Sequence, residues 1–253
     1  MKNPLSLTGK SVVVTGASAG IGRATAILLS ELGARVTLVG RNRGRLEETL
    51  NKLNGDGHSV QPFDLAEIDS IGGWFAGMAT AQGPFDGLVH SAGIGALLPL
   101  RALTTAHIEE TMRINVFAAM ALTKAFSRKR AYHPGAGIVL VASVAGLVGA
   151  PVRTVYSASK GALIAFARSA AMELAKGGIR VNCVAPAYVK TEMLDDASSA
   201  MLPEQMEKLI EATHPLGVGT PLDVAYSIAF LLAETGRWIT GSVLAVDGGY
   251  TAQ

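Results

Sequence analysis

The sequence is poor in cysteine, in net charge and in long apolar runs. Its 253 residues include one cysteine, Cys183, so an intrachain disulfide is impossible and a zinc site built from several cysteines is excluded. The formal net charge is only +2, which does not point to a nucleic-acid partner. Hydrophobic residues make up 49% of the chain and charged residues 17%, a balance typical of a globular protein rather than a disordered one.

Long apolar stretches are also missing. The most apolar stretch, residues 138–152, contains Ser143, glycines and Pro151, and is shorter than the roughly 20 residues that a transmembrane helix needs. Residues 1–10 lack the apolar core of a secretory signal. We therefore expect a cytoplasmic protein with no membrane partner.

Short β-branched runs alternate along the chain with longer helical patterns. The runs predict strands at residues 11–15, 35–39, 59–63, 88–90, 138–142, 180–185 and 242–246. The patterns between them predict helices at residues 21–32, 45–53, 68–81, 105–130, 155–175 and 221–233. Because the strands are continuously apolar, they indicate a parallel sheet covered by helices on both faces. We expect an α/β fold with one doubly wound, Rossmann-like domain over residues 1–253 and a seven-stranded sheet.

Residues 187–219 fit this alternation poorly. They are rich in methionine, serine, aspartate and proline, and ordered connections of this length are often lids or binding loops. We interpret the segment as a substrate lid, with two surface helices as the alternative.

A glycine-rich turn joins the first predicted strand to the first helix, in the stretch Thr15-Gly16-Ala17-Ser18-Ala19-Gly20-Ile21-Gly22. Glycines allow a tight turn and let backbone N–H groups approach a phosphate, to which the helix N-terminus adds its partial positive charge. The position of the turn between strand and helix favours a dinucleotide-binding site, to which we assign Gly16, Ser18, Ala19, Gly20, Ile21 and Gly22.

The end of the second strand bears on the choice of dinucleotide. Arg41 lies 19 residues past Gly22, about where an NAD-binding protein has an acidic residue for the ribose 2′-hydroxyl. A guanidinium instead suits a 2′-phosphate. NADP(H) is therefore favoured over NAD(H), the alternative being that Arg41 and Arg43 are simply a solvated helix start.

Tyr156 and Lys160 stand four residues apart and share one face of a predicted helix. Ser143 follows the strand at 138–142, at the carboxyl edge of the sheet, where ligands bind in this class of fold. A tyrosine phenol can donate a proton to a developing alkoxide and take it back in the reverse reaction. An ammonium nearby favours the phenolate, so we expect Lys160 to lower the pKa of Tyr156.

With these residues in place, the sequence resembles the short-chain dehydrogenase/reductase family from the glycine turn to Val246-Asp247-Gly248-Gly249. The resemblance implies that Ser143, Tyr156 and Lys160 are catalytic and that Asn115 joins a proton relay. It also implies that Tyr156 and Lys160 contact the cofactor. Further cofactor contacts implied by the resemblance are Asp64, Leu65, Ser91, Ala92, Gly93, Pro186, Val189 and Thr191.

The chain departs from the family pattern at several positions. The usual Asn-Asn-Ala-Gly after the fourth strand reads His90-Ser91-Ala92-Gly93, and the glycine that usually follows Pro186 is Ala187. Ala19 stands where NADP-dependent members often have a basic residue, so Arg41 alone supports NADP. We interpret His90 as a buried, hydrogen-bonded residue and Cys183 as a small buried one. No histidines have metal-ligand spacing, and we assign no metal.

These observations predict an NADPH-dependent oxidoreductase that reduces a ketone to a secondary alcohol, with Tyr156 as proton donor. Within the family the resemblance points toward reductases of 3-oxoacyl thioesters, but Met172 replaces the basic residue with which that subgroup meets its carrier protein. Other small carbonyl compounds therefore stay open as substrates. The alternatives are an NAD-dependent dehydrogenase that oxidises an alcohol, sugar or steroid, and a non-catalytic NADP-binding sensor. The resemblance also implies a homo-oligomer, either a tetramer or a dimer.

Overall fold

The computed structural model describes residues 3–95, 97–192, 208, 210 and 212–252. Within these residues, seven parallel strands form one sheet, as the sequence predicted, and their order is β3-β2-β1-β4-β5-β6-β7. The strands are β1 (Ser11–Thr15), β2 (Arg35–Gly40), β3 (Ser59–Pro62), β4 (Phe85–His90), β5 (Tyr132–Val141), β6 (Arg180–Pro186) and β7 (Val243–Val246). The order reverses direction between β1 and β4, and open sheets of this kind bind their ligands at such a switch point.

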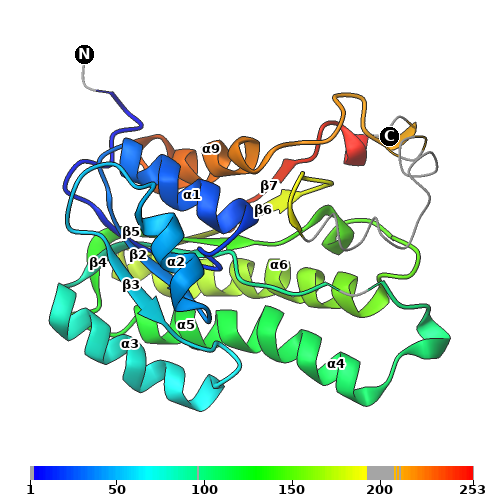
Figure 1. Cartoon of the computed structure of the whole chain (residues 1–253), viewed down its shortest axis with the longest axis horizontal. Coiled ribbons are helices and arrows are strands. Elements are labelled where there is room, and N and C mark those ends of the chain that lie inside the picture. Colours follow the sequence, from blue (N-terminus) through cyan, green and yellow to red (C-terminus); the bar gives the residue numbers. More distant parts are fainter. Residues whose placement is uncertain (1–2, 96, 193–207, 209, 211, 253) are drawn as a thin grey trace.

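Helices cover both faces of the sheet (Figure 1). One face carries α1 (Gly20–Glu31) and α9 (Pro221–Leu232), and the other carries α3 (Ile68–Gln82), α4 (Thr105–Met112), α5 (Ala118–Phe126) and α6 (Thr154–Leu174). The short helix α2 (Arg43–Leu50) follows β2. Single 3₁₀ turns lie at Leu100–Ala102, Val144–Gly146, Ala175–Gly177, Glu234–Gly236 and Tyr250–Ala252.

The alternation of side chains along each strand explains the two helical layers. In β1, Val12 and Val14 pack into the apolar core beneath α1 and α9, whereas Val13 points into the core beneath α3, α5 and α6. Because both faces are buried, the strand needs valine at every one of these positions. The site described below lies where such strands end.

The helix predicted at residues 105–130 contains a π-helical turn and ends at Phe126. α4 ends at Met112, residues Arg113–Phe117 form a π-helical turn, and α5 then runs only to Phe126. In the π turn the N–H of Ala118 donates to the carbonyl of Arg113, five residues back. Apolar periodicity cannot reveal this, because a π turn preserves the helix and adds one residue to it.

The lid predicted at residues 187–219 falls largely on residues 193–207, 209 and 211, which lie outside the described residues. On either side of them, Val189 and Gly219 form a parallel bridge, and the N–H of Lys190 donates to the carbonyl of Gly219. Among the described helices, none is both long and apolar enough to cross a membrane.

Candidate active site

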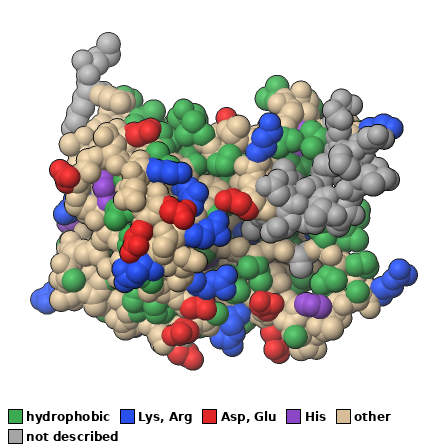
Figure 2. All heavy atoms as spheres, viewed as in Figure 1, with side chains coloured by type: hydrophobic (Ala, Val, Ile, Leu, Met, Phe, Trp, Pro, Cys, Tyr) green, Lys and Arg blue, Asp and Glu red, His purple; other side chains and the backbone are tan. Residues whose placement is uncertain are grey.

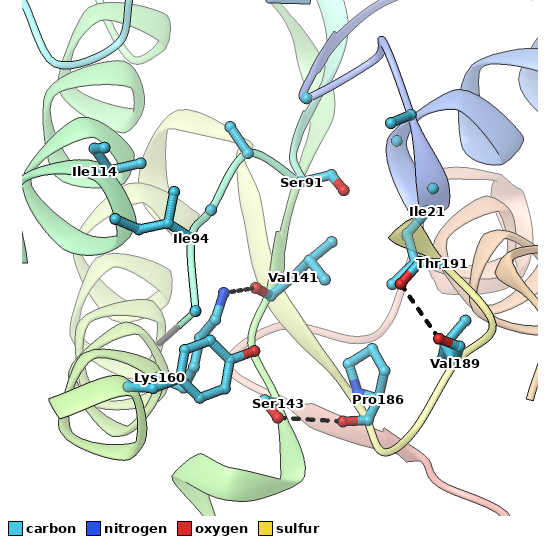
Figure 3. A pocket seen from close by; sticks show the side chains of 18 of the residues that line it. Ile21, Ser91, Ile94, Ile114, Val141, Ser143, Lys160, Pro186, Val189 and Thr191 are labelled. Atoms are coloured by element: carbon cyan, nitrogen blue, oxygen red, sulfur yellow. Dashed lines mark hydrogen bonds between the residues drawn. The ribbon is translucent and has the colours of Figure 1, made fainter. Parts of the chain in front are cut away.

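A cavity of about 780 Å³ opens at the carboxyl edge of the sheet. Its walls come mainly from residues that directly follow β1 to β6, together with the first turns of α1 and α6 (Figure 3). Predicted site residues that line it are Gly16, Ser18, Ala19, Gly20, Ile21, Gly22, Arg41, Asp64, Leu65, Ser91, Ala92, Gly93, Ser143, Tyr156, Lys160, Pro186, Val189 and Thr191. The cavity therefore brings together every predicted site residue except Asn115.

The glycine turn has no room for a side chain at Gly16 or at Gly22. Gly16 has a φ of +65°, and a Cβ there would lie 2.8 Å from the backbone nitrogen of Ala92. A Cβ on Gly22 would lie 2.2 Å from the carbonyl oxygen of Gly16. The first turn of α1 has no side-chain cap and no acidic residue, so its N–H groups and partial positive charge face the cavity. This turn fits the diphosphate of a dinucleotide.

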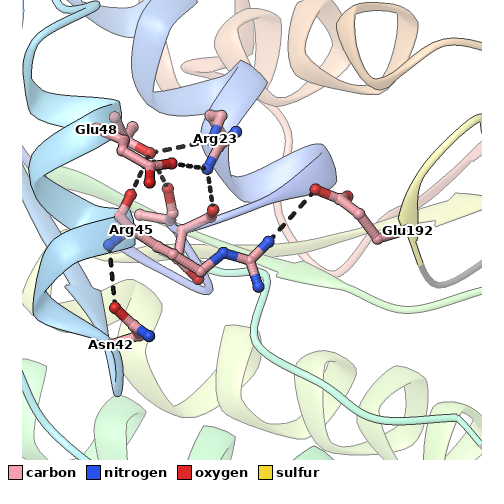
Figure 4. A network of polar contacts seen from close by, with 8 residues as sticks. Arg23, Asn42, Arg45, Glu48 and Glu192 are labelled. Atoms are coloured by element: carbon pink, nitrogen blue, oxygen red, sulfur yellow. Dashed lines mark hydrogen bonds and ion pairs between the residues drawn. The ribbon is translucent and has the colours of Figure 1, made fainter.

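Arg23 on α1 braces the glycine turn from behind (Figure 4). Its guanidinium donates to the carbonyl of Ser18 and to the hydroxyl of Thr49, and lies 3.5 Å from the carboxylate of Glu48. Thr49 in turn donates to the carbonyl of Ala17 at 3.0 Å. These bonds connect α1 and α2 to the turn and fix its backbone.

A basic depression beside the turn is lined by Ser18, Arg41, Asn42 and Arg45. Arg45 is positioned by Asn42, whose side chain accepts from its backbone N–H at 3.0 Å, and its guanidinium lies 3.5 Å from Glu192 (Figure 4). In Figure 2, which shows the molecule from the same side as Figure 1, several Lys and Arg side chains lie close together in the middle of the view, with acidic side chains beside them. Two guanidinium groups and a hydroxyl suit a phosphate monoester.

Sequence reasoning assigned Arg41 to this region, named Arg43 only in the alternative of a solvated helix start, and missed Arg45. Because α2 begins at Arg43, that residue points to the surface and pairs with Glu47, one turn on along the helix. Arg45 lies two positions further around the helix and lines the cavity instead. The spacing of the arginines could have predicted that Arg45 lines the cavity only if the first residue of α2 had been known.

Ser143 lies just beyond β5, at the far side of the cavity from Ile21 in Figure 3. Its hydroxyl donates to the carbonyl of Pro186 at 3.4 Å and accepts from the N–H of Ala145 at 3.2 Å. The second bond closes the 3₁₀ turn that follows the strand. The hydroxyl is thus held in place at the cavity wall by two neighbouring segments of backbone.

Tyr156 and Lys160 lie one turn apart on α6, and both are buried. The ammonium of Lys160 donates to the carbonyl of Val141 at 2.8 Å (Figure 3). It lies 5.6 Å from the centre of the Tyr156 ring. Burial lowers the pKa of Lys160 to about 8. Lys160 is therefore mostly charged at neutral pH and loses its proton under mildly alkaline conditions.

The expectation that the pKa of Tyr156 is lowered is wrong. Burial of the phenol raises its pKa above 10, and this outweighs the opposite effects of a hydrogen bond with Ser143 and of the charge on Arg153. The nearby ammonium is directed at the carbonyl of Val141. A phenol that keeps its proton at neutral pH is suited to donating it.

Asn115 lies behind the cavity, in the π turn between α4 and α5, and its side chain is fully buried. Its amide nitrogen donates to the carbonyl of Ile94 at 2.9 Å and to the hydroxyl of Ser159 at 3.0 Å. Its amide oxygen accepts from the N–H of Ile94 at 2.8 Å. A Cβ on Gly93 would lie 3.2 Å from that oxygen and 3.4 Å from the ammonium of Lys160, so both groups approach the same backbone.

His90 is buried at the end of β4, and its Nδ1 is paired with the hydroxyl of Thr15 at 3.0 Å, in line with the sequence-based interpretation. Burial, aided by the charge on Lys160, lowers the pKa of His90 to about 3, so the ring is neutral at physiological pH. Cys183 is buried as well, and burial raises the pKa of its thiol to about 12. Neither group is suited to proton transfer or nucleophilic attack near neutral pH.

The cavity also contains residues that the sequence did not single out for this site. Arg153 and Tyr188 lie against each other, and His214 and Tyr250 continue the same wall. Arg153 stands three residues before Tyr156, and this helical spacing was the one signal that could have drawn attention to it.

The comparisons with known proteins agree with this geometry. A family model described as enoyl-(acyl carrier protein) reductase matches residues 16–251. The 3-oxoacyl-[acyl-carrier-protein] reductase of Rickettsia prowazekii (strain Madrid E) is 34% identical over 246 residues, which is 97% of this chain and 98% of that protein. The chain belongs to the short-chain dehydrogenase/reductase family and is therefore an oxidoreductase of the type that acts on a nicotinamide cofactor.

Solved structures are similar over almost the whole chain. A dehydrogenase/reductase from Sinorhizobium meliloti 1021 has a TM-score of 0.89 at 32% identity, covering 98% of this chain and 97% of that one. A candidate NAD(P)-dependent gluconate 5-dehydrogenase from Beutenbergia cavernae has a TM-score of 0.90 at 32% identity, covering 99% and 100%. The structure of the latter holds NADP at low occupancy.

Proposed function

We propose that this protein is an NADPH-dependent reductase that converts a ketone to a secondary alcohol. The observation that supports this most directly is that Ser143, Tyr156 and Lys160 line one cavity with an uncapped glycine turn. When bound, the dinucleotide supplies a hydride to the carbonyl carbon of the substrate. The protein must then hold the carbonyl oxygen and provide a proton.

Tyr156 is the proton donor in this proposal. A tyrosine with an ordinary pKa of about 10 keeps its proton at neutral pH, and burial of this phenol raises its pKa further. The proton moves from the phenol oxygen to the substrate oxygen as that oxygen becomes an alkoxide. On substrate binding, the Ser143 hydroxyl turns its hydrogen from the carbonyl of Pro186 to the same oxygen and fixes its position, while it keeps the bond that it accepts from Ala145.

Lys160 and Asn115 support the proton transfer. The ammonium of Lys160 stabilises the phenolate that remains on Tyr156, and its distance of 5.6 Å from the ring centre is short enough for this effect in a buried site. Asn115 positions the backbone of Ile94 and the hydroxyl of Ser159 beside these groups. Asn115 thus acts through its neighbours.

The preference for NADPH rests on the basic depression at Ser18, Arg41, Asn42 and Arg45. An acidic side chain there would repel a 2′-phosphate, and Glu192, a carboxylate that lines the cavity, is paired with Arg45. The NADP in the B. cavernae structure adds support from a relative. The reverse reaction with NAD would use the same catalytic residues, but the two arginines disfavour it.

The substrate is a 3-oxoacyl thioester or another small carbonyl compound. The R. prowazekii protein is named for the reduction of a carrier-bound 3-oxoacyl group. In this chain Met172 is 77% exposed at the position where that subgroup offers a basic residue to its carrier, which weakens the case for a carrier-bound substrate.

The test is NADPH oxidation, followed by the nicotinamide absorbance, against 3-oxoacyl thioesters, cyclic ketones, ketosugars and oxo acids, with NADH in parallel. We expect turnover with NADPH and a lower kcat/KM with NADH. Faster turnover with NADH would overturn the cofactor assignment. If NADPH binds and no carbonyl compound is reduced, a sensor becomes the better description.

A homo-oligomer forms part of the same proposal. Leu222, Tyr226 and Phe230 recur every four residues on α9 and are exposed, as an interface between copies of the chain would require. Sedimentation velocity should detect a dimer or tetramer, and Tyr226→Glu should shift it toward the monomer. A monomeric wild-type protein would refute this part.

A further inference from the structure

Arg153 places a guanidinium in the cavity wall beside the proposed proton donor. Its Cζ lies 5.9 Å from the centre of the Tyr156 ring and 5.5 Å from that of Tyr188. Tyr188 stacks on His214 with ring centres 5.1 Å apart, and His214 in turn contacts Tyr250 at 5.0 Å. Arg153, Tyr188, His214 and Tyr250, which we call the aromatic wall, therefore form one continuous cluster that reaches Tyr156.

A cation–π contact with a tyrosine ring leaves the N–H groups of a guanidinium able to bind an anion. No ion pair of Arg153 is found among the residues that the structure describes. The carboxylates that line the cavity are engaged elsewhere, Glu192 with Arg45 and Asp64 with the N–H of Ala66. Within the described cavity, Arg153 thus lacks the anion that a half-buried guanidinium ordinarily has.

The local structure around Arg153 is unfavourable, which calls for a compensating role. Arg153 is the N-cap of the 21-residue helix α6 but forms no side-chain cap, a position at which Ser, Thr, Asp or Asn is preferred. Its positive charge also stands at the positive end of that helix. Val152, directly before it, has a φ of +55°, a left-handed conformation rare for a β-branched residue, and its carbonyl accepts from the N–H of Leu98 at 2.9 Å.

Strained backbone and locally unsuitable residues persist where function requires them. A proton donor with a free guanidinium at its side would accept a substrate that has a ketone at one position and an anion at another. A carboxylate matches the planar N–H edge of arginine in two parallel hydrogen bonds.

We propose that Arg153 binds a carboxylate of the substrate, so that the ketone reduced here is an oxo acid. This inference rests on the proposed function, because it takes Tyr156 as the proton donor. It makes Arg153 the residue that determines substrate specificity, with the rings of the aromatic wall holding its guanidinium in place.

Binding can be tested without turnover, by calorimetric titration of the enzyme saturated with NADP⁺. The probes are benzoate with benzamide and hexanoate with hexanamide, pairs that differ in charge and little in shape. We expect each carboxylate to bind about 10- to 100-fold more tightly than its amide, the range of a charge-assisted hydrogen bond. Absence of this preference in both pairs would overturn the inference.

Three variants separate charge from packing. Arg153→Asn should abolish the preference, Arg153→Lys should keep part of it, and Arg237→Asn, which removes an exposed arginine elsewhere, should leave it unchanged. NADPH affinity should be the same in all three. A large loss of NADPH affinity in Arg153→Asn would show that Arg153 binds the cofactor instead, and would overturn the inference.

Stability gives a readout that a packing role would move in the opposite direction. Asn is a preferred N-cap, so Arg153→Asn should raise Tm by about 2–4 °C. If Arg153 served only to pack against the tyrosine rings, its loss would lower Tm.

Kinetics distinguish this inference from the proposed function. Oxo acids should be reduced in preference to their methyl esters, and Arg153→Asn should reduce that preference about 10- to 100-fold, mainly through KM. Equal turnover of acid and ester by the wild type would refute the oxo-acid inference and leave the reductase intact. Carboxylate binding that depends on Arg153, without reduction of any ketone, would refute the reductase and retain the binding site.

Discussion

The two ends of the cavity are built in different ways. The cofactor end consists of residues that directly follow strands, such as Gly16 after β1, Arg41 after β2 and Ser91 after β4. The wall at the substrate end combines Arg153, Tyr188, His214 and Tyr250 from four separate segments. The sheet positions the residues of the cofactor end, whereas packing between loops positions those of the substrate end. Only the cofactor end therefore has a recognisable pattern in the sequence.

Removing the hydroxyl of Tyr156, where the two ends meet, should have the largest effect. Tyr156→Phe keeps the ring beside Arg153 and Lys160 but has no proton to donate, so kcat should fall about 10²- to 10⁴-fold. NADPH affinity should change much less. Steady-state rates and a fluorescence titration with NADPH measure both, and an unchanged kcat would refute the assignment of the proton donor.

Removing the two positive charges of the basic depression should affect cofactor binding alone and leave the substrate end of the cavity unchanged. In Arg41→Asn/Arg45→Asn the ratio of kcat/KM for NADPH to that for NADH should drop by at least about 100-fold, since two charge-assisted bonds of about 1.5–3 kcal/mol each are lost. The matched control is Arg43→Asn, because Arg43 is exposed and paired with Glu47. An equal drop in the control would mean that net charge, rather than a phosphate site, sets the preference.

A single methyl group should disturb the glycine turn. In Gly22→Ala the new Cβ would meet the carbonyl oxygen of Gly16 at 2.2 Å, so the backbone must shift. The Kd for NADPH should rise roughly 10- to 50-fold. Gly73→Ala, in an open position on α3, is the control and should stabilise the protein slightly. Undiminished NADPH binding by Gly22→Ala would refute the diphosphate site.

The smallest effect is expected from pH. Lys160 has a pKa of about 8, so its charge is present below pH 8 and is lost as pH rises through that value. Because the pKa of Tyr156 is raised, Lys160 should titrate first and kcat/KM for reduction should fall about tenfold from pH 7 to pH 9. A pH profile that stays flat to pH 10 would contradict the role given to Lys160.

The fold could be predicted because its buried strands appear in the sequence as short apolar runs. The valines of β1 face apolar helical layers on both sides, so the strand has a run of three valines that ends at the glycine turn. Each candidate residue that followed such a strand could then be assigned to one edge of the sheet. This reasoning covers the glycine turn, Arg41 and Ser143. Asp64 and Ser91 were predicted from the family resemblance instead.

The rest of the site could not be predicted from the sequence. It depends on the residue at which each helix begins and on contacts between residues far apart in the chain. Arg45 rather than Arg43 lines the cavity because α2 begins at Arg43. The pKa of Tyr156 is raised because burial exceeds the effect of nearby charges, a balance set by packing. Arg153 meets Tyr188 across a long stretch of chain, and no local pattern links them.

Because of the π turn at Arg113–Phe117, the function of this helix depends on the number of residues in it. Each residue advances an α-helix by about 100°, so a single-codon deletion within this turn would convert it to regular helix and rotate everything on one side of it relative to the other. Asn115 could be kept, yet its amide would no longer meet Ile94 and Ser159. In this helix, the number of residues therefore matters as much as their identity.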